Sequence, residues 1–348
     1  MILYKNSYLR FSFFTIFIFS VMVCCNTKDR EIKYITLSPA IINNEGLYTN
    51  FPGNMLADDQ YLYIEYPRSR DTSLGIHDIH TGEMLARTIP IGNGPGEFVT
   101  PRLLQIVSNE IYITDLNGSK DGFISVEKAL NGQYSFREAS INRKDRILKA
   151  LIINDSTKVI HNPQPATMFE MCRSGKTDHF GEPFVLDLNE ANRRRYYQGT
   201  MAYHEKKKVL VYSNFYLPYI SIYKYNNDIF DLAAEFKGFD KVKVKNGKPD
   251  IDNSRKGISG LTLSKDYIVC LQRDYERNSV DETTVGMDLS KVPSTVFLYS
   301  FRNAKLMKKI DLSCPVIRIA CSGNNNTLYA IVLLDNKLKV VKYDLSLI

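Results

Sequence analysis

The sequence feature that most constrains the fold is a pattern of turns and short strands that recurs six times. Each copy is an acidic, polar or glycine turn followed by alternating β-branched and aromatic residues, which is typical of a half-buried strand. The copies are DDQYLYIEY (58–66), SNEIYITDL (108–116), NDSTKVIHN (154–162), EKKKVLVYSN (205–214), SKDYIVCLQ (264–272) and NNNTLYAIVL (324–333). Their centres lie 47 to 60 residues apart, so each unit has room for several strands.

The residues around each copy extend the unit to four strands. An apolar segment precedes the copy and a second hairpin follows it, as in GIHDIHTGEMLARTI (75–89). Four strands in about 40–50 residues is the pitch of β-propeller blades, which bury their faces against their neighbours. We therefore predict an all-β fold, a six-bladed β-propeller of four-stranded antiparallel blades, over residues 33–348. Short helices are predicted only at 126–132 and 187–197.

The last unit has too few strands to complete a blade. It ends with the chain about three strands after Cys314. We predict that an N-terminal strand within REIKYITLSP (30–39) supplies the missing outer strand, closes the ring and removes exposed sheet edges. The two longest intervals between copies come from polar insertions at 240–256 and 275–293, which are predicted to be surface loops.

The N-terminus has the pattern of an export signal. Lys5 and Arg10 precede FSFFTIFIFSVMV (11–23), a segment without charge that is too short to span a bilayer. It ends at Cys24 and Cys25 and resembles the lipobox of bacterial lipoproteins, with methionine in place of the usual leucine three residues before Cys25. We predict a signal peptide at 1–24, lipidation of Cys25 (with Cys24 as second choice) and a tether at 25–32. An ordinary cleaved signal or a short anchor is the alternative.

Composition narrows the classes of partner. The net charge is +7, and it becomes +5 when Lys5 and Arg10 are removed with the signal, which argues against nucleic acid as the main partner. The chain has 22 tyrosines and 18 phenylalanines but no tryptophan, which weakens the case for a stacked-sugar platform. Four cysteines remain after the signal and are predicted to be buried free thiols: Cys172, Cys270, Cys314 and Cys321.

The glycine-rich segment GNGPGEF (92–98) raises the question of a phosphate site. A phosphate-binding loop of the Walker type needs a lysine and a hydroxyl residue after the last glycine, whereas Glu97 and Phe98 follow here. A dinucleotide site needs a helix directly after the glycines, whereas a proline and a strand follow. We predict a structural turn between blades one and two. In it Gly92, Gly94 and Gly96 supply positive φ angles, Pro95 stiffens the chain and the Glu97 carboxylate accepts backbone N–H groups.

The same segment carries a family resemblance. IGNGPGEFVTPR closely resembles the GxGPGE segment of six-bladed β-propeller lipoproteins, the TolB-like and NHL-like propellers of anaerobic Gram-negative gut bacteria. The resemblance extends over residues 30–348 as a pattern, and only 91–98 is specific. It implies a propeller attached to the outer membrane, facing the periplasm or the cell surface. The family has no shared catalytic residues, so the resemblance implies no active site.

One cluster is a candidate for ligand binding. Arg193, Arg194 and Arg195 adjoin Tyr196 and Tyr197, a combination of forked cations and aromatic faces suited to carboxylates, sulfates or planar ligands. A solvated helix end or inter-blade loop is the simpler interpretation.

The remaining patterns argue against catalytic and metal chemistry. His77 and His80 have a helical spacing but lie in a strand pattern, so we expect a strand residue and a turn residue rather than a metal site. No nucleophile elbow and no zinc-type cysteine pair is visible. We predict no catalytic residue, no metal and no cofactor.

These observations favour a binding or scaffold function. We expect a membrane-anchored ring, monomeric or part of an envelope complex, that binds a protein or glycan partner at its loop face. The alternative is a propeller enzyme, a hydrolase or lyase acting on an extracellular polymer or peptide, because propellers assemble sites from residues that are far apart in sequence.

Overall fold

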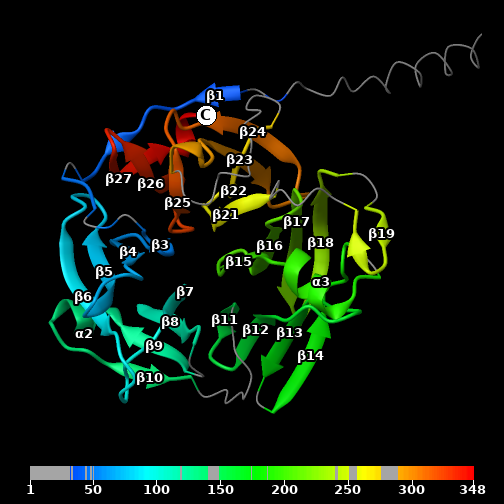
Figure 1. Ribbon diagram of the computed structural model, residues 1–348, viewed down its shortest axis with the longest axis horizontal. Helices are drawn as coiled ribbons and strands as arrows, with labels where there is room; N and C mark the ends of the chain where they lie inside the picture. Colours follow the sequence, from blue (N-terminus) through cyan, green and yellow to red (C-terminus); the bar gives the residue numbers. More distant parts are fainter. Residues whose placement is uncertain are drawn as a thin grey trace, which may run out of the picture. The chain divides into compact units, whose positions relative to one another are not determined.

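The protein folds as a ring of six β-sheets. The computed structural model describes residues 32, 34–43, 45–47, 49, 51–117, 120–139, 149–173, 175–185, 187–239, 242–250, 257–275 and 289–348. Residues 34–348 form one unit, in which six antiparallel sheets are the blades of a β-propeller around a common axis (Figure 1). The predicted six-bladed propeller is therefore confirmed.

The blades follow one another along the chain, each running from an inner strand at the axis to an outer strand. Blade 1 consists of β3 (Met55–Ala57), β4 (Tyr61–Glu65), β5 (Thr72–Asp78) and β6 (Met84–Pro90). Blade 2 consists of β7 (Pro101–Val107), β8 (Glu110–Asp115), β9 (Asp121–Ser125) and β10 (Phe136–Glu138). Blade 3 consists of β11 (Ala150–Asn154), β12 (Thr157–His161), β13 (Phe169–Arg173) and β14 (Lys176–Phe180).

The second half of the ring has the longer strands. Blade 4 consists of β15 (Gly199–His204), β16 (Val209–Asn214), β17 (Tyr219–Asn226) and β18 (Ile229–Lys237). Blade 5 contains β21 (Ile258–Leu263), β22 (Tyr267–Gln272), β23 (Thr295–Ser300) and β24 (Leu306–Asp311), and blade 6 contains β25 (Val316–Ala320), β26 (Thr327–Leu334) and β27 (Lys337–Asp344). The second strand of every blade overlaps one of the six sequence repeats, because the repeat marks the strand buried on both faces.

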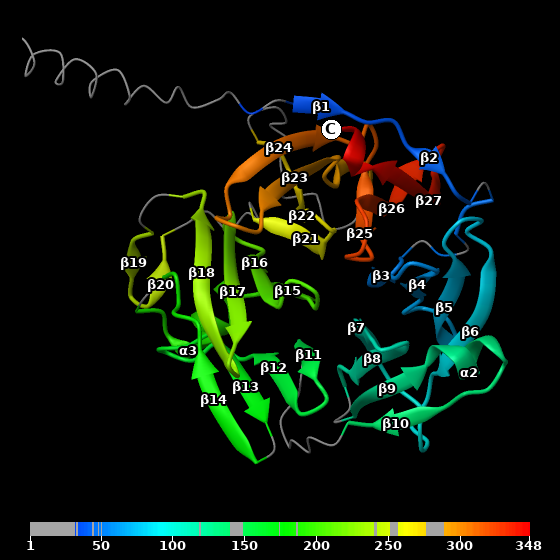
Figure 2. The same ribbon diagram turned by 180° about the vertical axis from the view of Figure 1, so that it is seen from behind.

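The N-terminal segment closes the ring with two short strands. β2 (Ala40–Ile41) pairs antiparallel with β27 and supplies the outer strand of blade 6, with Ala40 opposite Lys342. β1 (Tyr34–Thr36) pairs in parallel with β24 and adds a fifth strand to blade 5. Figure 2 shows β1 and β2 along the outer edges of these two blades. Closure by an N-terminal strand is confirmed, but the pairing that completes blade 6 begins one residue after the predicted segment 30–39.

Short helices and hairpins occupy the connections. α2 (Val126–Leu130) follows β9, with the Ser125 side chain accepting from the Lys128 N–H as its N-cap. α3 (Glu190–Tyr196) lies between β14 and β15 and is capped in the same way by Asn189. Both helices were predicted. A two-stranded hairpin, β19 (Val244–Lys245) with β20 (Lys248–Pro249), lies within the first insertion, and the 3-10 turns η2 (Leu289–Lys291) and η3 (Leu345–Leu347) lie in blades 5 and 6.

The core consists of the layers between adjacent blades, and one of these layers contains a buried ion pair. Between blades 2 and 3, the fully buried Lys158 ammonium lies 3.0 Å from an Asp121 carboxylate oxygen, which also accepts from the Tyr112 hydroxyl at 2.5 Å. The four cysteines predicted to be free are all free and buried.

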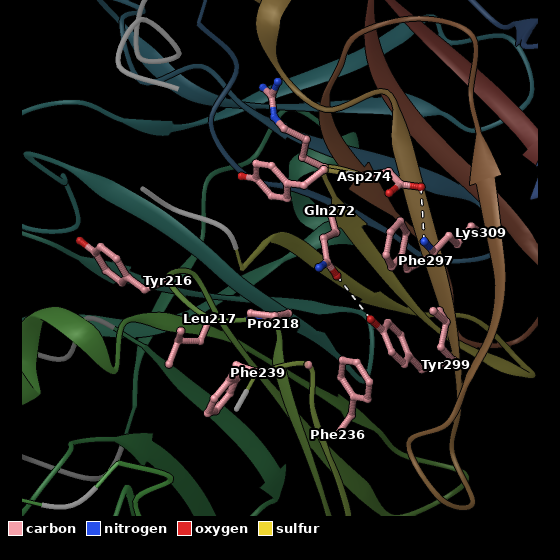
Figure 3. Close-up of a pocket in the computed structure, with 14 residues that line it drawn as sticks. Tyr216, Leu217, Pro218, Phe236, Phe239, Gln272, Asp274, Phe297, Tyr299 and Lys309 are labelled. Carbon is pink, nitrogen blue, oxygen red and sulfur yellow. Dashed lines mark hydrogen bonds and ion pairs between the residues drawn. The ribbon is translucent and has the colours of Figure 1, made fainter. Parts of the chain in front are cut away.

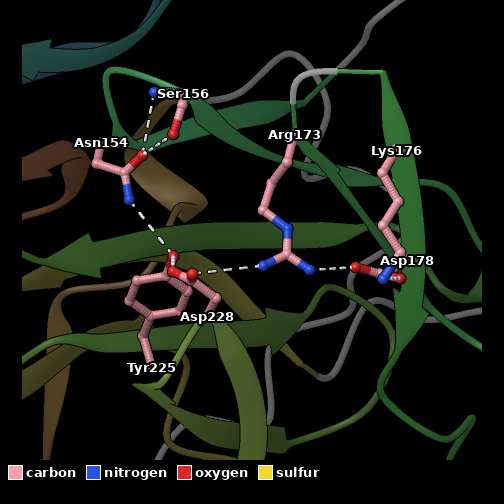
Figure 4. A network of polar contacts seen from close by, with 7 residues as sticks. All are labelled: Asn154, Ser156, Arg173, Lys176, Asp178, Tyr225 and Asp228. Atoms are coloured by element: carbon pink, nitrogen blue, oxygen red, sulfur yellow. Dashed lines mark hydrogen bonds and ion pairs between the residues drawn. The ribbon is translucent and has the colours of Figure 1, made fainter.

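A second polar network joins the hairpin ends of blades 3 and 4. Arg173 contacts Asp178 at 2.5 Å on its own blade and Asp228 at 3.7 Å on the next blade (Figure 4). Asp228 also accepts from the Tyr225 hydroxyl at 2.7 Å. The network connects the two blades at the hairpin face, which is the side of the ring where the first and second strands of each blade are joined.

Candidate functional site

The opposite side of the ring, which we call the loop face, collects the features that the sequence singled out. Because neighbouring strands are antiparallel, the second and fourth strands of each blade end on this face, and the third strand begins there. The segment 91–100 crosses there from β6 to β7, and α3 lies in the crossing from β14 to β15.

The GNGPGEF segment is a tight turn held by the Glu97 side chain. Glu97 Oε2 accepts from the Gly94 N–H at 2.8 Å, and the Lys120 ammonium donates to the carbonyls of Gly94 and Glu97 at 3.0 Å. Only Gly96 has the positive φ expected of all three glycines (+76°). Gly92 and Gly94 lie close to the Glu97 side chain, since a Cβ on Gly92 would lie 2.0 Å from Glu97 Oε2 and one on Gly94 would lie 2.9 Å from the same atom. The Glu97 carboxylate therefore fills the centre of the turn.

The arginine–tyrosine cluster divides between the surface and the core. Tyr196 and Tyr197 are buried, and the Tyr197 hydroxyl donates to the Val185 carbonyl. Burial raises the pKa of Tyr197 to about 12. Their ring faces are therefore not presented at the surface together with the arginines, as the ligand-binding hypothesis requires.

The arginines themselves also differ from one another. Arg193 donates to the Leu188 carbonyl, and Arg194 pairs with Glu190 at 2.6 Å on the exposed side of α3. Arg195 is exposed, with its guanidinium 5.3 Å from the Tyr196 ring centre. A ligand role remains a prediction for Arg194 and Arg195 only.

A cleft with a volume of about 550 Å³ lies on the loop face between blades 4 and 5 (Figure 3). We call it the aromatic cleft. Its walls come from the β16–β17 connection, the end of β18, the end of β22, and strands β23 and β24. The lining residues are Tyr216, Leu217, Pro218, Phe236, Gly238, Phe239, Gln272, Arg273, Asp274, Tyr275, Phe297, Tyr299, Leu306 and Lys309.

Aromatic rings line the aromatic cleft on both sides. Phe236 of blade 4 packs against Tyr299 of blade 5 with ring centres 5.2 Å apart, which joins the two blades at the floor. Phe236 and Phe239 are each only partly buried, so part of each ring remains accessible to a ligand. Six of the fourteen lining residues are phenylalanine or tyrosine, which gives the cleft flat, apolar faces.

The polar groups of the aromatic cleft come from the end of β22 and from β24. Gln272 Oε1 accepts from the Tyr299 hydroxyl at 3.3 Å, and Asp274 lies 3.5 Å from the Lys309 ammonium (Figure 3). The same ammonium lies 5.2 Å from the centre of the Phe297 ring. An amide, a carboxylate and an ammonium group are thus held at fixed positions beside aromatic walls, an arrangement typical of pockets that bind small polar molecules or side chains.

The histidines take up structural positions. His77 is buried on β5, where its ring bonds with the Tyr66 hydroxyl at 2.9 Å, and His80 is exposed in the following turn, as expected. The His161 ring packs against Phe169 and Tyr212, with ring centres 5.6 and 5.2 Å away. No group of His, Cys, Asp and Glu able to hold a metal ion occurs among the described residues.

Two sequence predictions concern the N-terminus. Cys24 and Cys25, with the whole predicted signal peptide, lie outside the residues that the structure describes. In the described ranges, no helix has the length and apolar character needed to cross a membrane.

Sequence reasoning did not identify the aromatic cleft. Its residues lie in three separate parts of the chain (216–239, 272–275 and 297–309), and most of them read as ordinary strand residues. The two insertions were the one feature of the sequence that pointed to this place. Both begin at the rim of the cleft, directly after Phe239 and at Tyr275, so the longest connections of the ring start where the candidate site lies.

Comparisons with known proteins support the fold but name no function. No protein-family model and no curated protein matches the sequence. The structure resembles a member of the DUF4221 family from Bacteroides vulgatus ATCC 8482, with 13% identity, coverage of 90% of this chain and 97% of that chain, and a TM-score of 0.54. It also resembles a presumed exported protein from Bacteroides fragilis NCTC 9343, with 10% identity, 89% and 98% coverage, and a TM-score of 0.55. At these identities the likeness is one of fold alone.

Proposed function

We propose that this chain is an exported, lipid-anchored β-propeller of the outer membrane that binds a protein or glycan partner in the aromatic cleft. The aromatic cleft is the observation that supports this binding function most directly. Its volume of about 550 Å³ lies within the range of roughly 300–1,000 Å³ common for ligand pockets, and its lining combines aromatic faces with a few fixed polar groups. A sugar ring or an aromatic side chain can pack on such walls while Gln272 and Asp274 fix the orientation of its polar groups.

Export and membrane attachment rest on separate support. The signal pattern with Cys24 and Cys25 and the GxGPGE segment indicate a propeller lipoprotein of the TolB-like or NHL-like type. The description of the Bacteroides fragilis structure as that of an exported protein agrees with this location. An anchored ring would hold its loop face accessible to partners in the periplasm or at the cell surface.

A fluorescence titration tests binding at the aromatic cleft. The chain has no tryptophan, so Phe239→Trp introduces a single reporter at the cleft, and Phe51→Trp introduces one just before blade 1 as a control. We expect a partner glycan or protein to change the emission of the first reporter saturably and to leave the second unchanged. Equal responses of the two reporters would place binding outside the cleft.

A matched pair of alanine variants locates the binding energy. Phe236→Ala removes a partly buried ring from the cleft wall, and Phe301→Ala removes a partly buried ring that packs on His204, away from the cleft. Loss of a ring contact of about 1–2 kcal/mol predicts roughly ten-fold weaker binding for Phe236→Ala. Equal affinities of the two variants would argue against the cleft.

The alternative, a hydrolase or lyase, predicts in addition that the bound partner is cleaved, which mass spectrometry of the titrated sample detects.

A further inference from the structure

Two arginines approach the start of blade 1 from opposite sides. Arg102 lies on β7, the inner strand of blade 2, and its Nη1 donates to Asn54 Oδ1 at 3.4 Å. Arg318 lies on β25, the inner strand of blade 6, and its Nε donates to the Gly53 carbonyl at 2.6 Å. Gly53 and Asn54 are consecutive and directly precede β3, so guanidinium groups from distant parts of the sequence meet beside one dipeptide. Figure 1 shows β25, β3 and β7 as neighbours around the axis.

The carboxylate of Glu65, which interacts electrostatically with both arginines, already has other partners. Glu65 is 4% exposed, and its Oε2 accepts from the Asn54 N–H at 2.7 Å while its Oε1 accepts from the Leu103 N–H. Within the described ranges, neither Arg102 nor Arg318 forms an ion pair. Two positive charges therefore face one negative charge whose oxygens are bonded to the backbone.

Arg102, Arg318 and Glu65 together carry more positive than negative charge, and the pKa shifts reflect this. Burial lowers the pKa of Arg318, the Glu65 charge opposes this, and the Arg102 charge lowers it further. Burial raises the pKa of Glu65, against the influence of Arg102 and Arg318. The two guanidinium groups are thus close enough to repel each other.

The backbone fixes these positions before any ligand arrives. The register of β7 with β8 shifts between Leu103 and Gln105, next to Arg102, and that of β25 with β26 shifts between Val316 and Arg318. Such bulges re-aim side chains at the ends of sheets. A Cβ on Gly53 would lie 2.1 Å from Glu65 Oε2, so only glycine lets Glu65 approach this closely. Both arginines remain partly accessible to solvent.

We propose that Arg102 and Arg318 together bind an oxyanion, the carboxylate, phosphate or sulfate group of a ligand, beside Asn54 at the inner edge of blade 1. Each guanidinium keeps N–H groups beyond those that bond to the protein, and the fork of donors matches the paired oxygens of an oxyanion. The bound anion would neutralise the excess charge. This site belongs to blades 6, 1 and 2 and does not share residues with the aromatic cleft, so it would bind even if the cleft did not.

The test measures anion binding by isothermal titration in dilute, chloride-poor buffer, with sulfate, phosphate and acetate as separate probes. We expect saturable binding of at least one probe, about ten-fold or more weaker in Arg102→Gln and in Arg318→Gln, because each loses a charge-assisted bond. Arg302→Gln, which removes an exposed charge from the β23–β24 turn, should bind as the unmodified protein does. The preferred probe distinguishes a carboxylate ligand from a phosphate or sulfate ligand.

Thermal unfolding provides a second readout that separates binding from general salt effects. Sulfate and phosphate stabilise folded proteins non-specifically, and this effect rises steadily with concentration in every variant. Site binding instead adds a stabilisation that saturates and is absent from both site variants. If Arg318→Gln does not fold, Arg318→Lys replaces it, since lysine keeps the charge but not the fork. Unsaturable, equal responses in all variants, or a loss confined to one of the two arginines, would overturn the shared site.

Discussion

Acidification should weaken the fold through His161, and the size of the effect follows from its surroundings. The His161 ring packs on Phe169 and Tyr212, and its Nε2 atom is buried without a hydrogen-bond partner. Burial first, and then the nearby Lys149 charge, lower its pKa from 6.5 to about 3. Because the unfolded chain binds a proton near pH 6.5 and the folded chain does not, stability is retained above pH 6.5 and lost as the pH falls toward 3.

The free-energy cost follows from the two pKa values of His161, 6.5 in the unfolded chain and about 3 in the folded chain. Linkage predicts that His161 costs the folded state about 2 kcal/mol at pH 5 and a few tenths of a kcal/mol at pH 7. Urea unfolding at the two pH values measures the difference. In His161→Gln the loss of stability between pH 7 and pH 5 should be smaller by about 2 kcal/mol, whereas exposed His179→Gln should match the unmodified protein. The same pH dependence in both variants would refute this account of His161.

Three further predictions concern other parts of the chain. Asp121→Asn should destabilise the protein by about 3–5 kcal/mol in urea unfolding, because the buried Lys158 charge loses its partner. The double variant Asp121→Asn/Lys158→Met should recover most of the lost stability, because the charge is then removed as well. A double variant as unstable as Asp121→Asn would contradict this explanation. Gly92→Ala should cost about 1–3 kcal/mol by crowding Glu97, and unchanged stability would mean that the turn rearranges freely. Cys25→Ala should abolish fatty-acid labelling in cells, and persistent labelling would move the lipid to another residue or end the lipoprotein hypothesis.

The architecture could be predicted because it is encoded locally. A strand buried on both faces must alternate or concentrate apolar residues, and each turn needs polar or glycine residues, so six copies of one pattern reveal six blades. Closure of the ring by an N-terminal strand could be predicted, because the last repeat unit has only three strands. The residues that make this pairing, Ala40 and Ile41, could not be predicted, because a two-residue outer strand has no periodicity of its own.

The candidate sites were harder to predict because they depend on contacts between blades. Arg102 and Arg318 meet only when the last blade closes on the first, and the walls of the aromatic cleft come from two different blades. The cluster around α3 illustrates the converse. Tyr196 and Tyr197 follow three arginines in the sequence, yet the helix turns both tyrosines inward while Arg194 and Arg195 face solvent. Adjacent residues in a sequence therefore need not form one surface.

The central claim is that partners bind at the aromatic cleft on the loop face. Hydrogen–deuterium exchange, with and without the partner found by the tryptophan reporter, tests it most directly. The account predicts slower exchange on binding at 216–218 and 236–239, which form one wall of the cleft, and unchanged exchange in the hairpins at 173–176 and 226–229 on the opposite face. Protection confined to those hairpins, with none at the cleft wall, would contradict it.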